Sequence, residues 1–164
     1  MAEPTTTTPA TPRGQRRGRR IAMSSDELDG FLGLERTCRV ATVGRDGAPH
    51  NVPLWFVWDG RALWLNSVVK SQRWTDLARD PRASVVIDAG EAYGELRGVE
   101  LVGRFEPVGD VPRTAAPDPA VATAEQLFAT KYGGSDTFVP DGRHAWLRLL
   151  PEKTVSWDFR KLGG

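Results

Sequence analysis

Residues 66 to 73, Asn-Ser-Val-Val-Lys-Ser-Gln-Arg, combine several groups that bind anions. The segment leaves a strand-like stretch and enters a helix-like one, so the free N–H groups and positive dipole end of a helix begin there. Lys70 adds a point charge, and Arg73 can hold two oxygens at once. The hydroxyls of Ser67 and Ser71 can donate to further oxygens. This combination predicts a phosphate site; the alternative is that Ser71 only caps the helix while Lys70 and Arg73 lie in solvent.

The segment just before it, residues 53 to 58, is rich in aromatic side chains. Strand alternation places Trp55 with Val57 on one face and Phe56 with Trp58 on the other. Both faces are then apolar, so we expect the strand to be covered on each side. One cover is the core, and the other is a helix, a partner subunit or a planar ligand.

No side chain stands out as catalytic, and we leave the catalytic residues unassigned. His50 follows a turn at the start of a strand and could act as a general base, but a single histidine there is more often a polar rim residue. Cys38 opens an apolar strand with no basic cluster around it, which indicates a small core residue rather than a reactive thiol. The sequence contains no glycine-rich phosphate loop and no serine-hydrolase elbow. One cysteine and two histidines cannot build a metal cluster, so we expect no metal.

The elements that would position these groups are mainly strands. Alternating or β-branched stretches predict seven of them, at residues 40–43, 51–58, 62–66, 83–88, 93–108, 145–150 and 154–159. Three helices are predicted, at residues 24–32, 71–80 and 120–132. The first of these begins with a capping box at Ser24 and is expected to end at Gly33.

The connections between the strands favour a closed sheet. Asp59-Gly60 predicts a tight hairpin, and glycines 94, 98 and 103 favour a long strand that bends sharply. Hairpin connections give antiparallel pairing, and closure removes exposed edges. We therefore predict a mainly β fold, a small split β-barrel of about seven mostly antiparallel strands with three helices packed outside.

The length and the charge distribution indicate one domain with a basic tail. The chain has 164 residues, 40% of them hydrophobic, which is enough to bury an unaided core. The first 20 residues hold five arginines and one glutamate, which leaves 17 basic and 20 acidic side chains for the remainder. We divide the chain into a disordered basic tail, residues 1–22, and a folded domain, residues 23–164. A mildly acidic body argues against nucleic acid as a partner.

Neither a membrane nor an export signal is indicated. No run of about 20 apolar residues occurs, and the mean hydropathy is −0.39. The paired arginines at positions 16–17 and 19–20 are not followed by the apolar stretch of an export signal. We therefore expect a cytoplasmic protein that does not contact a membrane.

Three segments, in this order, resemble the pyridoxamine 5′-phosphate oxidase-like flavin and deazaflavin oxidoreductases, the split β-barrel superfamily. They are Val-Ala-Thr-Val-Gly-Arg-Asp-Gly-Ala-Pro at residues 40–49, the strand 53–57 and the stretch 67–81. Residues 71–85 are similar to the family pattern S-x-K-x-x-N-L-x-x-D-P-R-x-S-x. The similarity runs from about Ser24 to Leu162, and it implies a split barrel that binds a flavin-type cofactor.

The resemblance also implies a homodimer in which the ring of the cofactor lies at the subunit interface. The residues that it assigns to the cofactor are Val52, Pro53, Leu54 and Trp55, whose backbone lines the ring; Ser67, Lys70, Ser71 and Arg73, which hold the phosphate; and Trp157, which approaches from the partner chain. Two positions depart from the family pattern, with Arg73 where lysine is usual and Asp76 where asparagine is usual. Arginine still binds phosphate, whereas a carboxylate near an anion argues against a direct role for Asp76.

The resemblance favours one cofactor and leaves two functions open. The chain lacks the C-terminal extension with which pyridoxamine-phosphate oxidases bind their substrate, so we do not expect vitamin B6 oxidation. Residues 93–99 and the terminal Ser-Trp-Asp look more like the group that uses the deazaflavin coenzyme F420 than like its FMN-using relatives; Arg97, Arg104 and Lys131 are candidates for the basic groove that its acidic tail needs. We expect hydride transfer from F420 or FMN to a small conjugated substrate, with the protein supplying binding and orientation. The alternative is a non-catalytic binder or carrier of a flavin, a deazaflavin or haem on the same fold.

Overall fold

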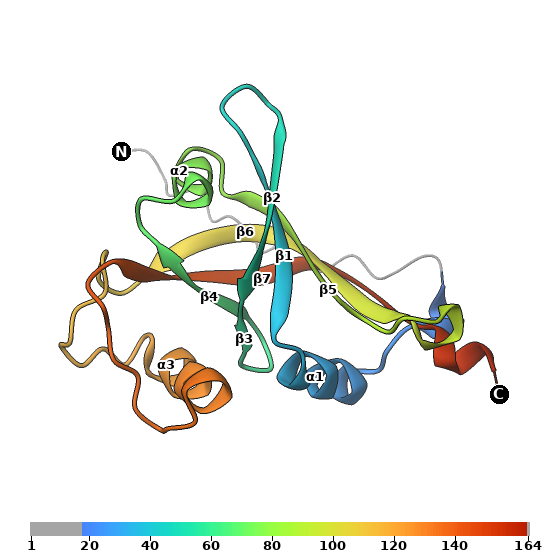
Figure 1. Cartoon of the computed structure of the whole chain (residues 1–164). Helices are drawn as coiled ribbons and strands as arrows, with labels where there is room; N and C mark the ends of the chain where they lie inside the picture. Colours follow the sequence, from blue (N-terminus) through green and yellow to red (C-terminus); the bar gives the residue numbers. More distant parts are fainter. Residues whose placement is uncertain (1–17, 164) are drawn as a thin grey trace, which may run out of the picture.

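The computed structural model describes residues 18–163, and its centre is a single seven-stranded sheet (Figure 1). The strands are β1 (Thr37–Val43), β2 (Pro49–Trp55), β3 (Val57–Trp58), β4 (Leu63–Val68), β5 (Arg82–Ala89), β6 (Arg97–Val108) and β7 (His144–Asp158). The helices are α1 (Ser25–Leu34), α2 (Gln72–Arg79) and α3 (Ala122–Phe128). Short 3-10 turns lie at Arg19–Ile21, Tyr93–Glu95 and Phe159–Leu162, and a π turn at Ala129–Gly133 continues α3. Residues 1–17, most of the predicted basic tail, lie outside the described residues.

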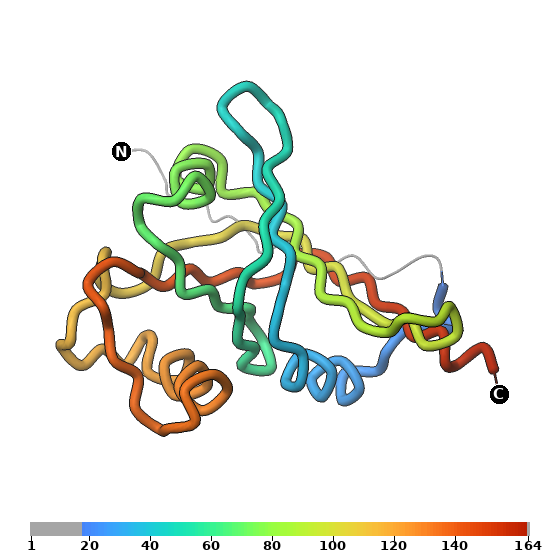
Figure 2. Tube along the Cα trace, viewed as in Figure 1, coloured from blue at the N-terminus to red at the C-terminus, as the bar shows by residue number. Residues whose placement is uncertain are grey.

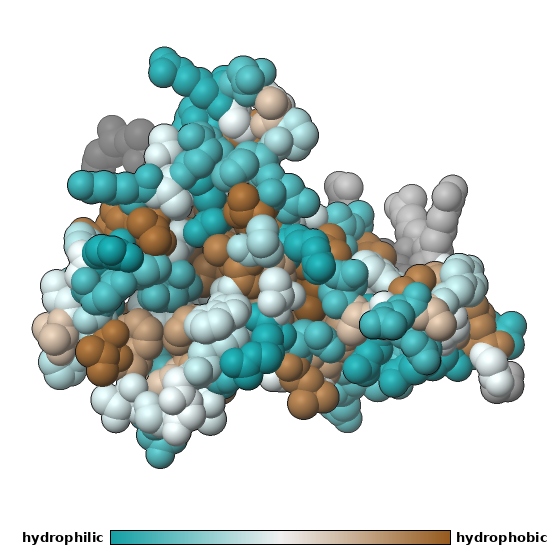
Figure 3. Space-filling model, in the orientation of Figure 1, coloured by the Kyte–Doolittle hydropathy of each residue, from teal (hydrophilic) through white to brown (hydrophobic). Residues whose placement is uncertain are grey.

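The sheet has the order β2-β1-β5-β6-β7-β4-β3, and every pairing is antiparallel. Figure 2 traces β5, β6 and β7 as long curved segments, with the β1–β2 hairpin projecting from the body. The sheet is thus curled into a split barrel, and the predicted mainly β fold with seven strands and three helices is confirmed. In Figure 3 the projecting hairpin carries mostly hydrophilic side chains, while apolar ones interrupt the middle of the same face.

The strands are divided differently from the prediction. The expected strand 51–58 is interrupted at Phe56, and the two expected C-terminal strands form the single long strand β7. The interruption is possible because the Tyr132 hydroxyl replaces the lost strand partners. It accepts a hydrogen bond from the Phe56 N–H (3.0 Å) and lies 2.7 Å from the carbonyl oxygens of both Phe56 and Arg36, which share its single proton.

The break at Phe56 leaves the predicted faces in place. Phe56 and Trp58 pack on the main core, whereas Val57 lies in the cluster beside α3 together with Phe128 and Tyr132. Trp55 is 52% exposed but contacts the same two rings, so the predicted pairing of Trp55 with Val57 on one face is confirmed. Its ring stacks on Tyr132, with ring centroids 4.4 Å apart and planes 9° from parallel. The same tyrosine therefore holds both the backbone and the aromatic ring at the end of β2.

Two of the three glycines that predicted a bent strand act in β6. Gly103 lies at a bulge in the β6–β7 pairing, which increases the local twist. Gly98 faces Trp157 across the ladder, and a Cβ atom there would lie only 2.5 Å from the Trp157 ring and 2.7 Å from the Ile87 carbonyl oxygen. Gly94 lies in the 3-10 turn before β6, because the strand begins at Arg97 and not at Tyr93 as predicted.

The first two helices begin directly after the predicted caps, whereas the third begins at Ala122, two residues later than predicted. The capping box at Ser24 is present, with the Glu27 N–H donating to the Ser24 hydroxyl and the Ser24 N–H donating to the Glu27 carboxylate. However, α1 continues through Gly33 and ends at Leu34. The third helix is shorter than expected and passes into the π turn, which Gly134 ends in a left-handed conformation with φ 63°.

The core lies inside the curl, with a smaller apolar cluster between the sheet and α3. Cys38 belongs to the main core, and burial raises the pKa of its thiol to about 12. This confirms Cys38 as an inert core residue. No helix within residues 18–163 is long and apolar enough to cross a membrane, and no group of three or more His, Cys, Asp or Glu side chains in that range could hold a metal ion.

Tyr132→Phe should destabilise the protein by about 1–3 kcal/mol, because it leaves the backbone groups of Phe56 without their partner. Urea denaturation of the wild type and the variant measures this difference. The control is Tyr93→Phe, since Tyr93 is 71% exposed and should show almost no loss. Equal stability of Tyr132→Phe and the wild type would contradict the role given to this hydroxyl.

Candidate functional site

Two of the predicted phosphate residues lie on the inner side of the sheet. Arg73, on α2, is 7% exposed, and its Nη2 donates to the hydroxyl of Ser67, which is fully buried on β4 (2.9 Å). Its Nε is buried and has no partner, and no carboxylate in residues 18–163 pairs with the guanidinium. Burial lowers the pKa of Arg73. The fold therefore holds a positive charge below the start of α2 without a counter-ion.

The other two predicted phosphate residues lie at the surface. Ser71 is the N-cap of α2 and accepts a hydrogen bond from the Trp74 N–H (3.2 Å). Lys70 is exposed and lines a cavity of about 500 Å³ together with Val68, Val69, Pro112, Gly142 and Arg143. The structure thus joins Ser67 to Arg73 and separates this pair from Lys70. Ser71 does cap the helix, but Arg73 does not lie in solvent.

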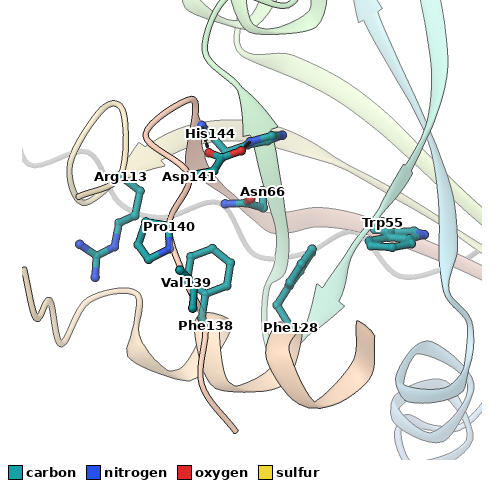
Figure 4. Close-up of a pocket in the computed structure, with 9 residues that line it drawn as sticks. All are labelled: Trp55, Asn66, Arg113, Phe128, Phe138, Val139, Pro140, Asp141 and His144. Atoms are coloured by element: carbon teal, nitrogen blue, oxygen red, sulfur yellow. Dashed lines mark hydrogen bonds and ion pairs between the residues drawn. The ribbon is translucent and has the colours of Figure 1, made fainter. Parts of the chain in front are cut away.

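A second cavity, of about 380 Å³, adjoins the first on the outer side of β4 (Figure 4). Its lining residues are Trp55, Asn66, Arg113, Phe128, Phe138, Val139, Pro140, Asp141 and His144. We call it the aromatic compartment and the cavity at Lys70 the cationic compartment. The chain segments at residues 112–113 and 141–144 supply side chains to both, so the two compartments lie next to each other.

The floor of the aromatic compartment is the β4–β7 ladder. Asn66 pairs with Trp146 and Val68 pairs with His144, so these four side chains lie on one face of the sheet. Trp146 is fully buried and supports the rings of Phe128 (5.7 Å) and Phe138 (5.4 Å), which form the wall. Figure 4 shows the Asn66 amide pointing into the space beside Pro140 and Phe138. Its Nδ2 is buried and has no hydrogen-bond partner.

The segment between the two compartments is held by Asp141. Its Oδ1 accepts from the N–H groups of Arg143 (2.9 Å) and His144 (3.1 Å), and its Oδ2 lies 2.7 Å from His144 Nδ1. The Arg143 N–H is the largest of several influences, the His144 contacts among them, that lower the pKa of Asp141 to about 2. Asp141 is therefore ionised at neutral pH and orients the His144 ring.

Arg113 lines the aromatic compartment, but protein oxygens already accept from four of the five N–H groups of its guanidinium. Its guanidinium donates to Glu125 (2.6 Å) and to the carbonyl oxygens of Thr114 and Ala116, and the side chain is 4% exposed. The backbone N–H of Arg113 also donates to the His144 carbonyl oxygen (2.8 Å). Arg113 therefore anchors the segment before α3 against β7.

The residues predicted to line the cofactor ring lie on an edge strand. In the part of the chain that the structure describes, β2 pairs only with β1, which leaves the outer backbone groups of residues 52–55 without a strand partner. Val52 and Leu54 are half-buried, and Pro53 and Trp55 are exposed. Trp55 reaches the aromatic compartment, so this end of β2 and the compartment are continuous.

Trp157 lies far along the sheet from Ser67 within one chain. Ser67 pairs with Ala145 near the start of β7, and the twelve residues from Ala145 to Trp157 span about 40 Å of strand. The Trp157 ring instead covers Gly98 on β6. The three basic residues suggested for a longer groove are also apart, with Arg97 beside Glu35 (3.9 Å), Arg104 paired with Glu152 (3.2 Å) and Lys131 donating to the Leu32 carbonyl oxygen (3.1 Å).

Sequence reasoning missed the C-terminal half of the site. Asp141, Arg143 and His144 follow a loop some 70 residues after the anion-binding segment, and no motif joins the two regions. The one local signal is Pro140-Asp141-Gly142, a turn sequence directly before a strand. Asn66 stands inside the segment that sequence analysis singled out, but only the structure shows that its amide is unpartnered.

Comparison with known proteins agrees with this architecture. The family model for pyridoxamine 5′-phosphate oxidase matches residues 24–158. The conserved hypothetical protein Rv2991 from Mycobacterium tuberculosis is 31% identical, with a TM-score of 0.75 over 92% of this chain and 94% of that one. An F420 reductase (22% identity, TM-score 0.57, 77% and 94% covered) and the haem storage protein HutZ from Vibrio cholerae (15%, 0.64, 80% and 93%) share the fold. No curated protein matches the sequence.

The fold defines a split-barrel protein with adjoining cationic and aromatic compartments on the outer face of β4. The chain belongs to the pyridoxamine 5′-phosphate oxidase family.

Replacing the buried Arg73 by an apolar residue of similar length should not destabilise the fold. Arg73→Met removes a buried charge that has no counter-ion, so the free energy of unfolding should equal or exceed that of the wild type. Urea denaturation in a buffer without phosphate or sulfate measures it. The control is Arg113→Met, which removes the buried guanidinium from the half-buried Glu125 and from two backbone carbonyl oxygens and should cost about 2–3 kcal/mol. A comparable loss in both variants would show that Arg73 is a structural residue.

Asp76 has a structural role that depends on pH. Its buried carboxylate on α2 accepts from Gln72 (2.9 Å), Thr42 on β1 (3.2 Å) and Arg79 (3.3 Å). Burial alone would raise the pKa of Asp76, but the hydrogen bonds from Gln72, Arg79 and Thr42 lower it overall. The stabilisation is therefore present above the ordinary aspartate value, about pH 4, and is lost as the pH falls through the lower folded value.

Asp76→Asn should accordingly be less stable than the wild type at pH 6, and the difference should shrink as the pH falls toward 2. Urea denaturation at several pH values measures the two curves. Asp136→Asn, on an exposed loop, is the matched control and should follow the wild type throughout. A difference that stays constant with pH would contradict the ionised state of Asp76.

Proposed function

We propose that the protein is a flavin-type reductase that binds coenzyme F420, or alternatively FMN, and transfers hydride to a small conjugated substrate. The observation that carries this proposal is the adjoining pair of compartments, one bordered by Lys70 and Arg143 and the other by aromatic rings and the Asn66 amide. Both cofactors have an anionic end and a planar ring system. The cationic compartment suits the anionic end, the edge of β2 at residues 52–55 suits the ring, and the aromatic compartment, which Trp55 joins to that edge, suits a flat substrate. The family to which the chain belongs supports the same class of cofactor.

The residues present fit such a molecule. Lys70 and Arg143 would hold the anionic end beside the N-terminus of α2, where Ser71 is the cap and the uncompensated charge of Arg73 lies below. The open backbone of residues 52–55 would line the ring, as the family resemblance implies.

The cofactor, when bound, supplies the hydride chemistry, and the chain supplies position and surroundings. Trp55 and Phe128 lie close together (6.1 Å) and would exclude water from the ring. Phe138, Val139 and Pro140 close the opposite side of the aromatic compartment. A small planar substrate would enter between these apolar walls.

The functional unit in this proposal is a homodimer. Trp157 lies about 40 Å along β7 from the residues near Ser67, so only a second copy of the chain would bring it to the cofactor. Preference for F420 over FMN rests on residues 93–99 and the Ser-Trp-Asp at 156–158, which resemble the deazaflavin-using group. The shared fold of an F420 reductase is consistent with this preference.

Titration of the purified protein with F420 and with FMN tests the proposal. We expect tight binding of one of them and a loss of at least about 100-fold in affinity for Lys70→Ala combined with Arg143→Ala, since each charge-assisted hydrogen bond contributes about 1.5–3 kcal/mol. The matched control is Arg45→Ala with Arg61→Ala, which removes the same charge from exposed turns. Tight binding without reduction of any conjugated acceptor would favour the non-catalytic carrier. Binding of neither cofactor, or of haem alone, would refute the proposal.

A further inference from the structure

The aromatic compartment contains a histidine–aspartate pair that the binding of a cofactor does not require. His144 Nδ1 lies 2.7 Å from the Asp141 carboxylate, and the backbone of His144 is fixed at both its N–H, by Asp141, and its carbonyl oxygen, by Arg113. In the described part of the chain no hydrogen bond involves His144 Nε2. A carboxylate at Nδ1 keeps a proton on that nitrogen, so Nε2 is the atom that exchanges protons with a ligand.

Asn66 completes a polar pair on the same face of the sheet. It is the diagonal neighbour of His144 in the β4–β7 ladder, and such neighbours lie about 7–8 Å apart. Its buried Nδ2 lacks a partner and points into the compartment (Figure 4). Around these two polar groups the walls are apolar, formed by Phe128, Phe138 and Val139. The compartment therefore offers one fixed donor and one proton-exchanging group to a flat ligand.

We propose that the aromatic compartment receives the conjugated carbonyl substrate itself, with Asn66 donating to its carbonyl oxygen, His144 as the proton donor and Asp141 as the residue that positions His144. This inference rests on the proposed function for its reductant. The Asn66 amide stabilises the charge that develops on the carbonyl oxygen.

The chemical step is balanced by the groups named. The hydride from the reduced cofactor adds to the β-carbon of the substrate and breaks the carbon–carbon π bond. The π electrons take, at the α-carbon, the Nε2 proton of the doubly protonated His144 ring, and the Nε2–H bond breaks. The product is the saturated carbonyl compound, and the neutral imidazole recovers its proton from water. Asp141 keeps Nδ1 protonated throughout, so that Nε2 alone changes its state.

The first experiment needs no cofactor and uses benzalacetone, a small planar enone, as the probe. Quenching of tryptophan fluorescence measures its binding to the full chain, because Trp55 lines the compartment. Asn66→Leu should weaken binding about tenfold, while Asn51→Leu, the same change at an exposed position of β2, should leave it unchanged. Equal binding by Asn66→Leu and the wild type would overturn the proposed oxygen contact.

The second experiment follows the imidazole nitrogens by ¹⁵N NMR. The neutral His144 ring should carry its proton on Nδ1, and its Nε2 resonance should shift when benzalacetone is added, while the resonances of His50 stay in place. Asp141→Asn should move the proton from Nδ1 to Nε2, which a merely structural loss would not do. A wild-type Nε2 resonance unaffected by the probe would overturn the contact with His144.

The third experiment measures a single turnover of benzalacetone in protein loaded with the reduced cofactor. His144→Gln should slow the reduction about 100-fold or more and leave the affinity for benzalacetone within about threefold. His50→Gln, the same change at the other histidine, should keep the wild-type rate. An unchanged rate in His144→Gln would overturn the proton transfer.

These experiments separate this inference from the proposed function. If the wild type binds neither F420 nor FMN, the proposed function fails and the proton transfer fails with it. The fluorescence and NMR experiments would still show whether Asn66 and His144 form a binding site for a conjugated carbonyl compound.

Discussion

The pairing of β4 with β7 is the constraint on which the site depends. Strand alternation sends Ser67 to the inner face of this ladder and Asn66 and Val68 to the outer face. The inner face therefore contacts Arg73 and the core, while the outer face forms the floor of the aromatic compartment with Trp146 and His144. A shift of this pairing by one residue would exchange the two sets of side chains. The register of the ladder thus decides which polar groups meet a ligand.

A second interaction connects this ladder to the edge of the sheet. Tyr132 satisfies the backbone at Phe56, where the strand is interrupted, and its ring supports Trp55. The interruption lets β2 pair with β1 while β3 turns to pair with β4. The two edges of the split barrel are therefore joined through a side chain from the turn after α3. Trp55 reaches the compartment because of that connection.

The fold could be predicted from the sequence more completely than the site could. Local patterns identified the capping box at Ser24, the hairpin at Asp59-Gly60 and the long strand that contains Gly98 and Gly103, because each depends on neighbouring residues. The break at Phe56 was not predictable, since it depends on a hydroxyl 76 residues further along the chain. The helix cap at Ser71 could be predicted, like the one at Ser24, because a cap depends only on residues next to it in the sequence. The proximity of Lys70 to Arg143, and of Asn66 to His144, comes from β4–β7 pairing, which no local pattern specifies.

The charge of Arg73 links the two faces of β4. A guanidinium without a counter-ion is costly in a buried position, and an apolar residue there would avoid that cost. In the less polar interior its field is weakly screened, so an anion bound beside Lys70 and Arg143, as proposed above, would experience a third positive charge that it need not touch. Ser67 accepts a hydrogen bond that fixes the guanidinium while leaving its charge unneutralised. A carboxylate at that position would have stabilised Arg73 and cancelled this field, so a serine is the residue that the proposed anion site requires there.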